Sequence, residues 1–191
     1  KRALDAAMKE ARENKETCVL LFQDEGTFYR QPSQACLWAP SGRRQPYMRY
    51  SHRTNTRMRV IGYLNPITGA VHAEDMSSVT VKRLARSVSG LPDLYPHADT
   101  LYLVWDNWPN HTHPTVQDAL ARHPRVKVVP LPTYAPWLNP AEKLWRWTRQ
   151  RVSHAHPWCD DFREFRGQVM AELNAFYEGS EELLRYVGLS T

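Results

Sequence analysis

Three short apolar runs, separated by longer segments, constrain the fold of this chain more than any other feature. The runs occupy residues 18–22, 101–105 and 126–129. Their length, and the polar, Gly or Pro residues that follow them, predict buried strands. Because segments with helical periodicity lie between and after these runs, we expect a sheet covered by helices.

The remaining elements complete an α/β pattern. Residues 58–64 and 70–75 flank Asn65-Pro-Ile-Thr-Gly69 and are predicted to form a hairpin. Helices are predicted at residues 1–15, 78–89 (closed by Gly90), about 114–122, 140–152 and 161–177. Since the hairpin comes early and the strand–helix alternation late, we expect a mixed sheet with antiparallel strands first and parallel strands later.

Composition narrows the class of protein. The chain has 191 residues and is 42% hydrophobic, which suits one domain with a full core. Its formal net charge of +5 suits a polyanionic partner, although proteins with no nucleic-acid role share this balance. The three cysteines lie far apart, which fits a reducing cytosol, and no apolar run or signal peptide predicts a membrane. Because the chain opens on Lys1 within a helical pattern, we expect that an N-terminal part was removed.

Two aspartates follow apolar runs and are candidates for chemistry. Asp24 and Asp106 each come just past the end of a predicted strand. Active sites of α/β sheets gather at such strand ends. The alternative for either residue is an ordinary turn-forming Asp. Strand alternation is expected to point Glu25 away from the face of Asp24.

A third carboxylate lies in the proline-rich segment 132–145. Asn139 is a good N-cap and Pro140 suits the first helical position, which puts Glu142 in the first turn of a helix. Glu142 would then either face the strand ends or cap its own helix as part of a capping box. Helical spacing predicts one packed face and a neighbouring charged face, made respectively of Ala141, Trp145, Thr148 and Val152, and of Glu142, Arg146 and Arg149.

Three motifs together resemble a known family. They are Asp24-Glu25, Asp106-Asn-x-x-x-His111 and Tyr134-Ala-Pro-x-Leu-Asn-Pro-x-Glu142-x-x-Trp145. In combination, over roughly residues 18–151, they resemble the DDE transposases of the mariner-like superfamily, and most of all its bacterial insertion-sequence branch. The third motif is the most specific of the three.

The resemblance implies a fold and a metal site. The fold would be RNase H-like, α/β, with a mixed five-stranded sheet of three antiparallel strands followed by parallel strand–helix units, flanked by helices. Asp24, Asp106 and Glu142 would be the catalytic and metal-binding residues for two Mg²⁺ ions, with Mn²⁺ as a substitute. Mg²⁺ prefers oxygen ligands, and a pair of such ions suits an in-line phosphoryl transfer.

The resemblance also implies an activity and partners. The chain would be the catalytic domain of a cut-and-paste transposase, which cleaves DNA at the element's terminal inverted repeats and joins it to target DNA, commonly at TA. We expect a lead-in helix at 1–16, the catalytic domain at 17–178 and a tail at 179–191. Family members carry an upstream helix-turn-helix region that this chain lacks, act as homodimers, and would work in the bacterial cytoplasm at the nucleoid.

Several other residues are candidates for supporting roles. Asn107 and His111 follow Asp106, and His111 is expected to hydrogen-bond a scissile phosphate or a metal-bound water, with a surface His before a helix as the alternative. Predicted DNA-binding residues are Arg43, Arg44, Arg53, Arg57, Arg146 and Arg149, with Arg49, His52, Arg59, Arg151, Tyr47 and Tyr50 nearby. The alternative for the segment 43–59 is a solvated loop. His154, His156 and Cys159 lack a fourth ligand, so zinc is not expected there.

Two further functions stay open from the sequence. One is a non-transposing nuclease on the same RNase H-like scaffold, which would hydrolyse DNA or RNA but never join strands. The other is a domesticated, transposase-derived DNA-binding module. The presence of all three carboxylates argues against the second.

Overall fold

A five-stranded sheet in the order β3-β2-β1-β4-β5 forms the centre of the molecule. The computed structural model describes residues 2–34, 41–42, 48–133 and 135–189. The strands are β1 (Cys18–Tyr29), β2 (Arg57–Leu64), β3 (Val71–Asp75), β4 (Thr100–Trp105) and β5 (Val126–Pro130). Pairs β1–β2 and β2–β3 are antiparallel, whereas β1–β4 and β4–β5 are parallel, so the predicted mixed sheet is confirmed.

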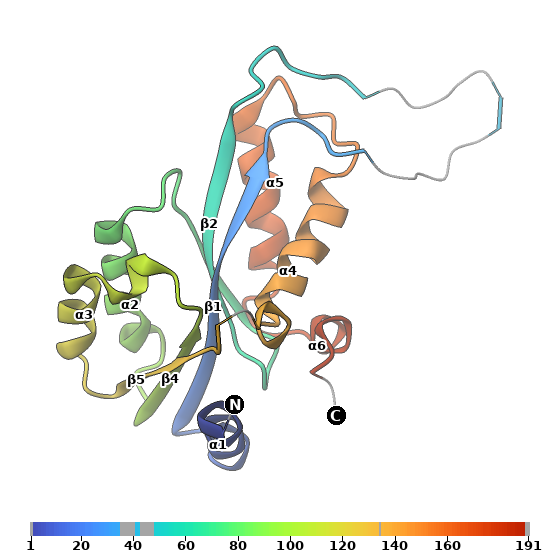
Figure 1. Ribbon diagram of the computed structural model, residues 1–191. Helices are drawn as coiled ribbons and strands as arrows, with labels where there is room; N and C mark the ends of the chain where they lie inside the picture. The colour runs from blue at the N-terminus through green and yellow to red at the C-terminus, as the bar shows by residue number, and fades with distance from the viewer. Residues whose placement is uncertain (1, 35–40, 43–47, 134, 190–191) are drawn as a thin grey trace.

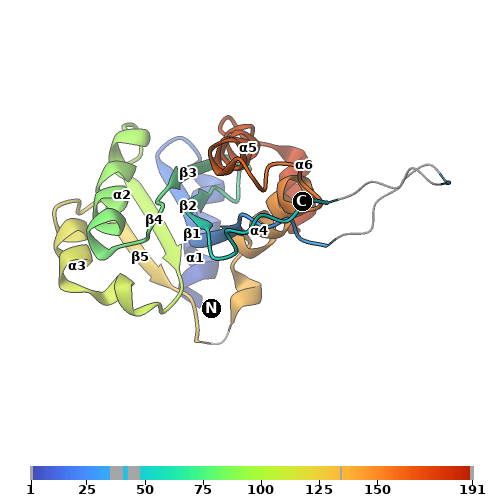
Figure 2. The same ribbon diagram turned by 90° about the horizontal axis from the view of Figure 1, so that it is seen from above.

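Helices cover both faces of the sheet (Figures 1 and 2). One face carries α2 (Val81–Leu94) and α3 (Pro114–Ala121), and the other carries α1 (Arg2–Glu13), α4 (Ala141–Thr148), α5 (Phe162–Asn174) and α6 (Glu181–Val187). Alternate residues of β1 serve the two cores, since Val19 and Leu21 pack with α2 and α3 while Leu20 and Phe22 pack with the other helices. No helix in the described ranges is long and apolar enough to cross a bilayer.

Helix α2 is longer than predicted. It runs through Gly90 and Pro92 to Leu94, where the sequence indicated an end at Gly90. Leu84, Val88 and Leu91 are all fully buried, so packing against the sheet outweighs the low helix propensity of Gly and Pro. At the C-terminus of the helix, the guanidinium of Arg125 donates to the backbone oxygen of Pro92 in the last turn and to that of Tyr95, the C-cap.

Strand β1 is also longer than predicted, and this corrects the position of Asp24. The carboxylate does not follow the strand but lies within it, because pairing with β2 continues from Phe22↔Leu64 to Tyr29↔Arg57. Pairing with β4, in contrast, stops at Phe22↔Val104. Asp24 therefore lies just beyond the end of the parallel pairing. Asp106, which follows β4, lies at the same end of the sheet.

Candidate active site

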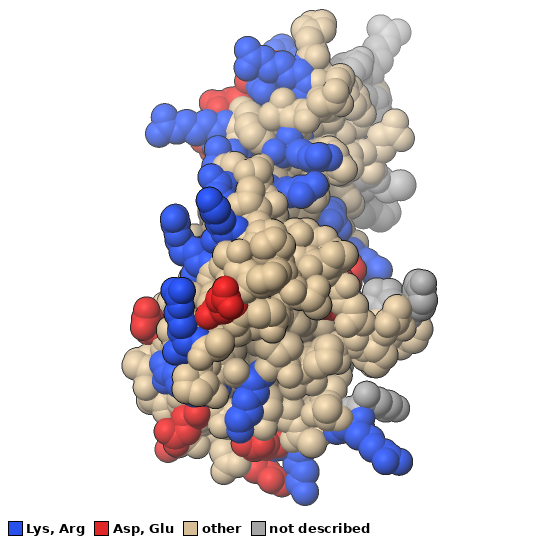
Figure 3. Space-filling view, turned by 60° about the vertical axis from the view of Figure 1, so that its left-hand side comes forward, with Lys and Arg blue, Asp and Glu red and all other residues tan. Residues whose placement is uncertain are grey.

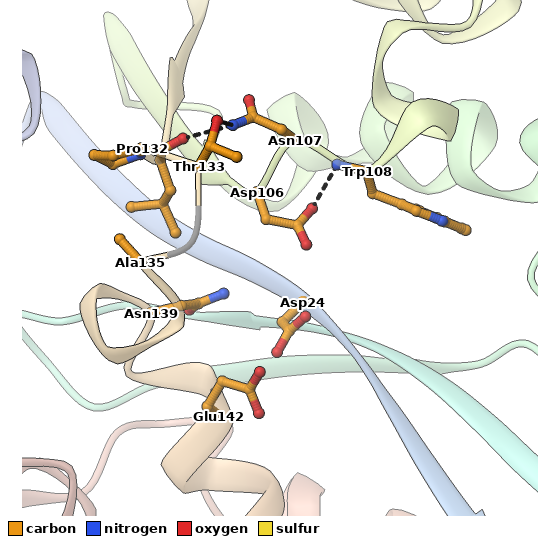
Figure 4. A pocket seen from close by; sticks show the side chains of 10 residues that line it. Asp24, Asp106, Asn107, Trp108, Pro132, Thr133, Ala135, Asn139 and Glu142 are labelled. Carbon is orange, nitrogen blue, oxygen red and sulfur yellow. Dashed lines mark hydrogen bonds between the residues drawn. The ribbon is translucent and has the colours of Figure 1, made fainter.

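Three carboxylates from three separate elements line one cavity of about 280 Å³. Asp24 comes from β1, Asp106 follows β4, and Glu142 lies in the first turn of α4 (Figure 4). The other lining residues are Asn107, Trp108, Leu131, Pro132, Thr133, Ala135 and Asn139. The sequence-predicted carboxylates thus share one cavity, although no three His, Cys, Asp or Glu side chains among the described residues are grouped tightly enough to hold a metal ion as they stand.

Asp24 is the most perturbed of the three carboxylates. Burial, followed by the negative charges of Glu25 and Glu142, raises the pKa of Asp24 to about 7. The indole of Trp145 donates to its Oδ2 at 3.0 Å and opposes that shift. Ionised Asp24 and Glu142 therefore repel each other, and a bound cation would relieve this repulsion.

Asp106 has the opposite electrostatic environment. The neighbouring His111 side chain, together with the backbone N–H of Trp108, lowers the pKa of Asp106. That N–H donates to Oδ1 of Asp106 at 3.0 Å and fixes the carboxylate at the start of the loop after β4. The side chain of Asp106 is exposed, and with its lowered pKa it stays ionised over the physiological range.

Asn139 positions the helix that carries Glu142. Its Oδ1 accepts from the backbone N–H of Ala141 at 3.1 Å, and its Nδ2 donates to the backbone oxygen of Gln23 at 3.2 Å. Asn139 was predicted to be the N-cap, but α4 begins at Ala141 and Pro140 is its N-cap, so Asn139 contacts the helix from the residue before the cap. The second bond joins α4 to β1 beside Asp24. The Glu142 carboxylate is exposed and forms no hydrogen bond back to Asn139, so a capping box is not seen in this part of the chain.

His111 lies beside Asp106, as expected, but it is buried and does not line the cavity. Its side chain is 2% exposed and stacks on Trp105 with ring centroids 4.1 Å apart, so the surface-His alternative is wrong. Nδ1 lies 2.9 Å from the backbone oxygen of Asp106 and 3.2 Å from its Oδ1, and Nε2 lies 3.7 Å from Oε1 of Glu25. Burial disfavours the charged ring, but the carboxylates of Asp106 and Glu25 outweigh it and raise the pKa of His111 to about 9. The ring thus contacts Asp106 through Nδ1 but does not itself line the cavity.

Glu25 acquires a role that the sequence did not predict. It lies on the opposite face of β1 from Asp24, as strand alternation predicted, and there it faces His111. The amide of Gln23 donates to Oε1 of Glu25 at 2.7 Å and holds it in place. Asn107 stays at the cavity, where its Nδ2 donates to the backbone oxygen of Leu131 at 3.0 Å and to the hydroxyl of Thr133 at 3.2 Å.

The predicted DNA-binding arginines fall into three groups. Arg43 and Arg44 lie outside the described residues. Arg53, Arg57 and Arg146 are exposed, and on the face shown in Figure 3 Lys and Arg side chains predominate over the upper part, towards the end where β2 begins. Arg149 is half-buried, with its guanidinium 5.7 Å from the centroid of the Phe28 ring. Part of its side chain therefore packs against the protein and is not exposed to solvent.

Two glycines make room for Trp145 beside Asp24. A Cβ at Gly62 would lie 2.4 Å from Cη2 of the indole, and one at Gly26 would lie 2.8 Å from Cε3. Gly62 pairs with Asp24 across the strands. Because these positions are far apart in sequence, no local pattern indicated that they share a contact.

Replacing Gly62 is expected to damage the fold. Gly62→Ala adds a methyl group where the indole of Trp145 already packs, so we expect about 1–3 kcal/mol of destabilisation, the usual cost of overpacking. Urea denaturation measures it. Gly167→Ala on α5, where nothing lies within 4 Å, is the control and should stabilise the helix by up to about 1 kcal/mol. Equal effects of the two substitutions would contradict a tight indole slot.

A family model and a curated relative each match most of this chain. The sequence matches the family model described as DDE superfamily endonuclease over residues 19–166. The insertion element IS630 uncharacterized 39 kDa protein of Shigella sonnei is 24% identical over 137 residues, which cover 72% of this chain. Those residues span only 39% of that relative's length.

Solved structures show the same fold. A Mos1 transposase paired-end complex with the left transposon end matches with a TM-score of 0.66 and 16% identity, over 96% of this chain and 55% of that chain. The catalytic domain of Mos1 mariner transposase matches with a TM-score of 0.60 and 14% identity, over 98% of this chain and 85% of that chain. The RNase H-like architecture expected from the sequence is thereby confirmed.

Proposed function

Since this chain belongs to the DDE superfamily endonucleases, we propose that it is the catalytic domain of a cut-and-paste DNA transposase. It would cleave DNA at the terminal inverted repeats of an element and join the freed ends to target DNA at TA sites. The observation that carries this proposal is the meeting of Asp24, Asp106 and Glu142 around one cavity. The structural neighbours include a pre-cleavage Mos1 transpososome and a Mos1 strand transfer complex, which supports both steps.

The three carboxylates suit two divalent cations. All three offer only oxygen atoms, the ligands that Mg²⁺ and Mn²⁺ prefer. Burial, together with the negative charges of Glu25 and Glu142, raises the pKa of Asp24, and cations bound there would neutralise this group of charges. Bound there, the ions would activate the attacking oxygen and stabilise the leaving one. Mos1 structures described as complexes with Mn and with Mg are among the neighbours of this chain.

The chain's own residues would organise the site. Asn139 holds the first turn of α4 against β1, which keeps Glu142 near Asp24. His111 and the backbone N–H of Trp108 hold Asp106 at the cavity. Groups fixed in this way do not have to reorganise when a phosphate arrives, which lowers the barrier to reaction.

The basic side chains would hold the DNA backbone. Arg146 lies one turn after Glu142 on the exposed side of α4, and the half-buried Arg149 follows just after the end of this helix. Arg53 and Arg57 extend the basic surface along the start of β2, with Arg43 and Arg44 as further predicted contacts. Four points remain predictions. They are a homodimer, an upstream helix-turn-helix region, action at the nucleoid in the bacterial cytoplasm, and a division into residues 1–16, 17–178 and 179–191.

Joining of DNA strands tests the proposed function. The protein is incubated with Mg²⁺, a target plasmid and DNA that ends in the pre-cut terminal repeat flanking its gene. We expect covalently joined products, with none formed by Asp106→Asn. Hydrolysis without joining would instead support a non-transposing nuclease, and DNA binding without either reaction would support a domesticated module.

A further inference from the structure

The indole of Trp145 is fixed against the carboxylate of Asp24. Trp145 is 1% exposed, and its Nε1 donates to Oδ2 of Asp24 at 3.0 Å. Few side chains can deliver a single neutral donor to a carboxylate from within an apolar core, and Trp is one of them. The contact therefore joins the packed interior to the edge of the cavity.

The direction of that donor is set by the strands beneath it. The indole lies directly against Gly26 and Gly62, because a Cβ at either position would come within 3 Å of the ring. Phe28 packs edge-on against the indole, with ring centroids 6.1 Å apart and an interplanar angle of 82°. These contacts hold the ring in the orientation in which its N–H points at Asp24.

The same contact links two of the three carboxylates. Trp145 lies three residues after Glu142 on α4, so both side chains project from neighbouring positions of one helix. Asp24 comes from β1. A bond from Trp145 to Asp24 therefore fixes the height of α4 over β1, and with it the separation between Asp24 and Glu142.

We propose that Trp145 is a positioning residue, whose indole N–H orients the Asp24 carboxylate and sets its distance from Glu142 so that the pair can hold a divalent cation. This inference rests on the proposed function, because it assigns Asp24 and Glu142 to the metal. It adds a buried aromatic residue to the groups that determine metal affinity.

The chain contains a matched comparison for this role. Trp147, two residues later, is also buried, and its Nε1 donates to Oε1 of Glu172 at 2.9 Å. Both bonds join an α4 indole to a carboxylate, but Glu172 lies on α5 and does not line the cavity. A purely structural role predicts the same consequences when either N–H is removed.

Metal binding without DNA separates the two roles. Trp145→Phe and Trp147→Phe each remove one indole N–H, and the thermal stabilisation of each variant is measured against Mn²⁺ concentration. We expect both variants to lose some stability, but only Trp145→Phe to need about 10–100-fold more Mn²⁺, as is usual when a group that orients a ligand is lost. The Mg²⁺ concentration for half-maximal DNA cleavage should rise in parallel.

A shape-preserving variant covers the case in which Trp145→Phe does not fold. Placing β-(3-benzothienyl)alanine at position 145 keeps the shape of the ring and removes only the donor, and the same loss of Mn²⁺ affinity is expected. Unchanged affinity in a folded variant that lacks the donor would overturn the positioning role, while the parent's binding and cleavage would leave the proposed function standing. If the parent itself neither binds Mn²⁺ nor cleaves DNA, both proposals fail.

Discussion

Asp106→Asn is expected to lower the rate of Mg²⁺-dependent DNA cleavage by about 10³-fold, because several kcal/mol of transition-state stabilisation depend on the metal that this carboxylate would hold. The substitution is nearly isosteric. The Asn oxygen can still accept from the backbone N–H of Trp108, and the contact from His111 to the backbone oxygen of residue 106 is unaffected. The fold is therefore expected to survive, and a single-turnover cleavage assay with a circular dichroism melt measures both properties.

The same strand supplies a control for this substitution. Asp99 is exposed at the opposite end of β4, next to Thr100, and does not line the cavity. Asp99→Asn removes one negative charge from the residue before β4, as Asp106→Asn does from the residue after it, and should cleave at the parental rate. If Asp106→Asn cleaved as fast as Asp99→Asn, Asp106 would have no part in the chemistry.

The carboxylates were predictable because each lies in a local pattern. Asp106 follows an uninterrupted apolar strand, and Glu142 follows an Asn-Pro helix start, so short stretches of sequence were enough to locate both. Asp24 was located less well. The segment from Gln23 to Gly26 looks like a strand end when read alone, and only its pairing with β2 keeps it in the sheet.

The contacts that His111 and Trp145 make with the carboxylates could not be predicted in the same way. His111 is buried because it stacks on Trp105 and faces Glu25, which is distant in sequence and adjacent in the fold. The bond from Trp145 to Asp24 depends on the register between β1 and β2, which puts Gly62 opposite Asp24. Local periodicity carries no information on such register, so sequence reasoning could place these residues in motifs but not assign what they touch.

Asp24→Asn is expected to stabilise the metal-free protein above neutral pH. The folded state raises the pKa of Asp24 to about 7, so it binds this proton more tightly than the unfolded chain does. The contribution of Asp24 to stability is therefore complete below pH 4, the range of an unfolded Asp, and is lost as the pH rises through 7. Asn resembles the protonated form and can still accept from Trp145, so it should escape that loss.

The size and direction of the effect make this prediction decisive. Each pKa unit corresponds to about 1.4 kcal/mol, so the variant's advantage in chemical denaturation with EDTA should grow from near zero at pH 4 to a few kcal/mol at pH 8. Mn²⁺ should then stabilise the parent and have little effect on Asp24→Asn, which removes the advantage. Asp99→Asn controls for the loss of a negative charge.

A pH-independent difference between parent and variant would mean that Asp24 is not held in a crowded, buried environment. The predicted pattern would mean that the parent retains a carboxylate that destabilises its metal-free fold, as expected where a side chain is kept for a ligand and not for stability.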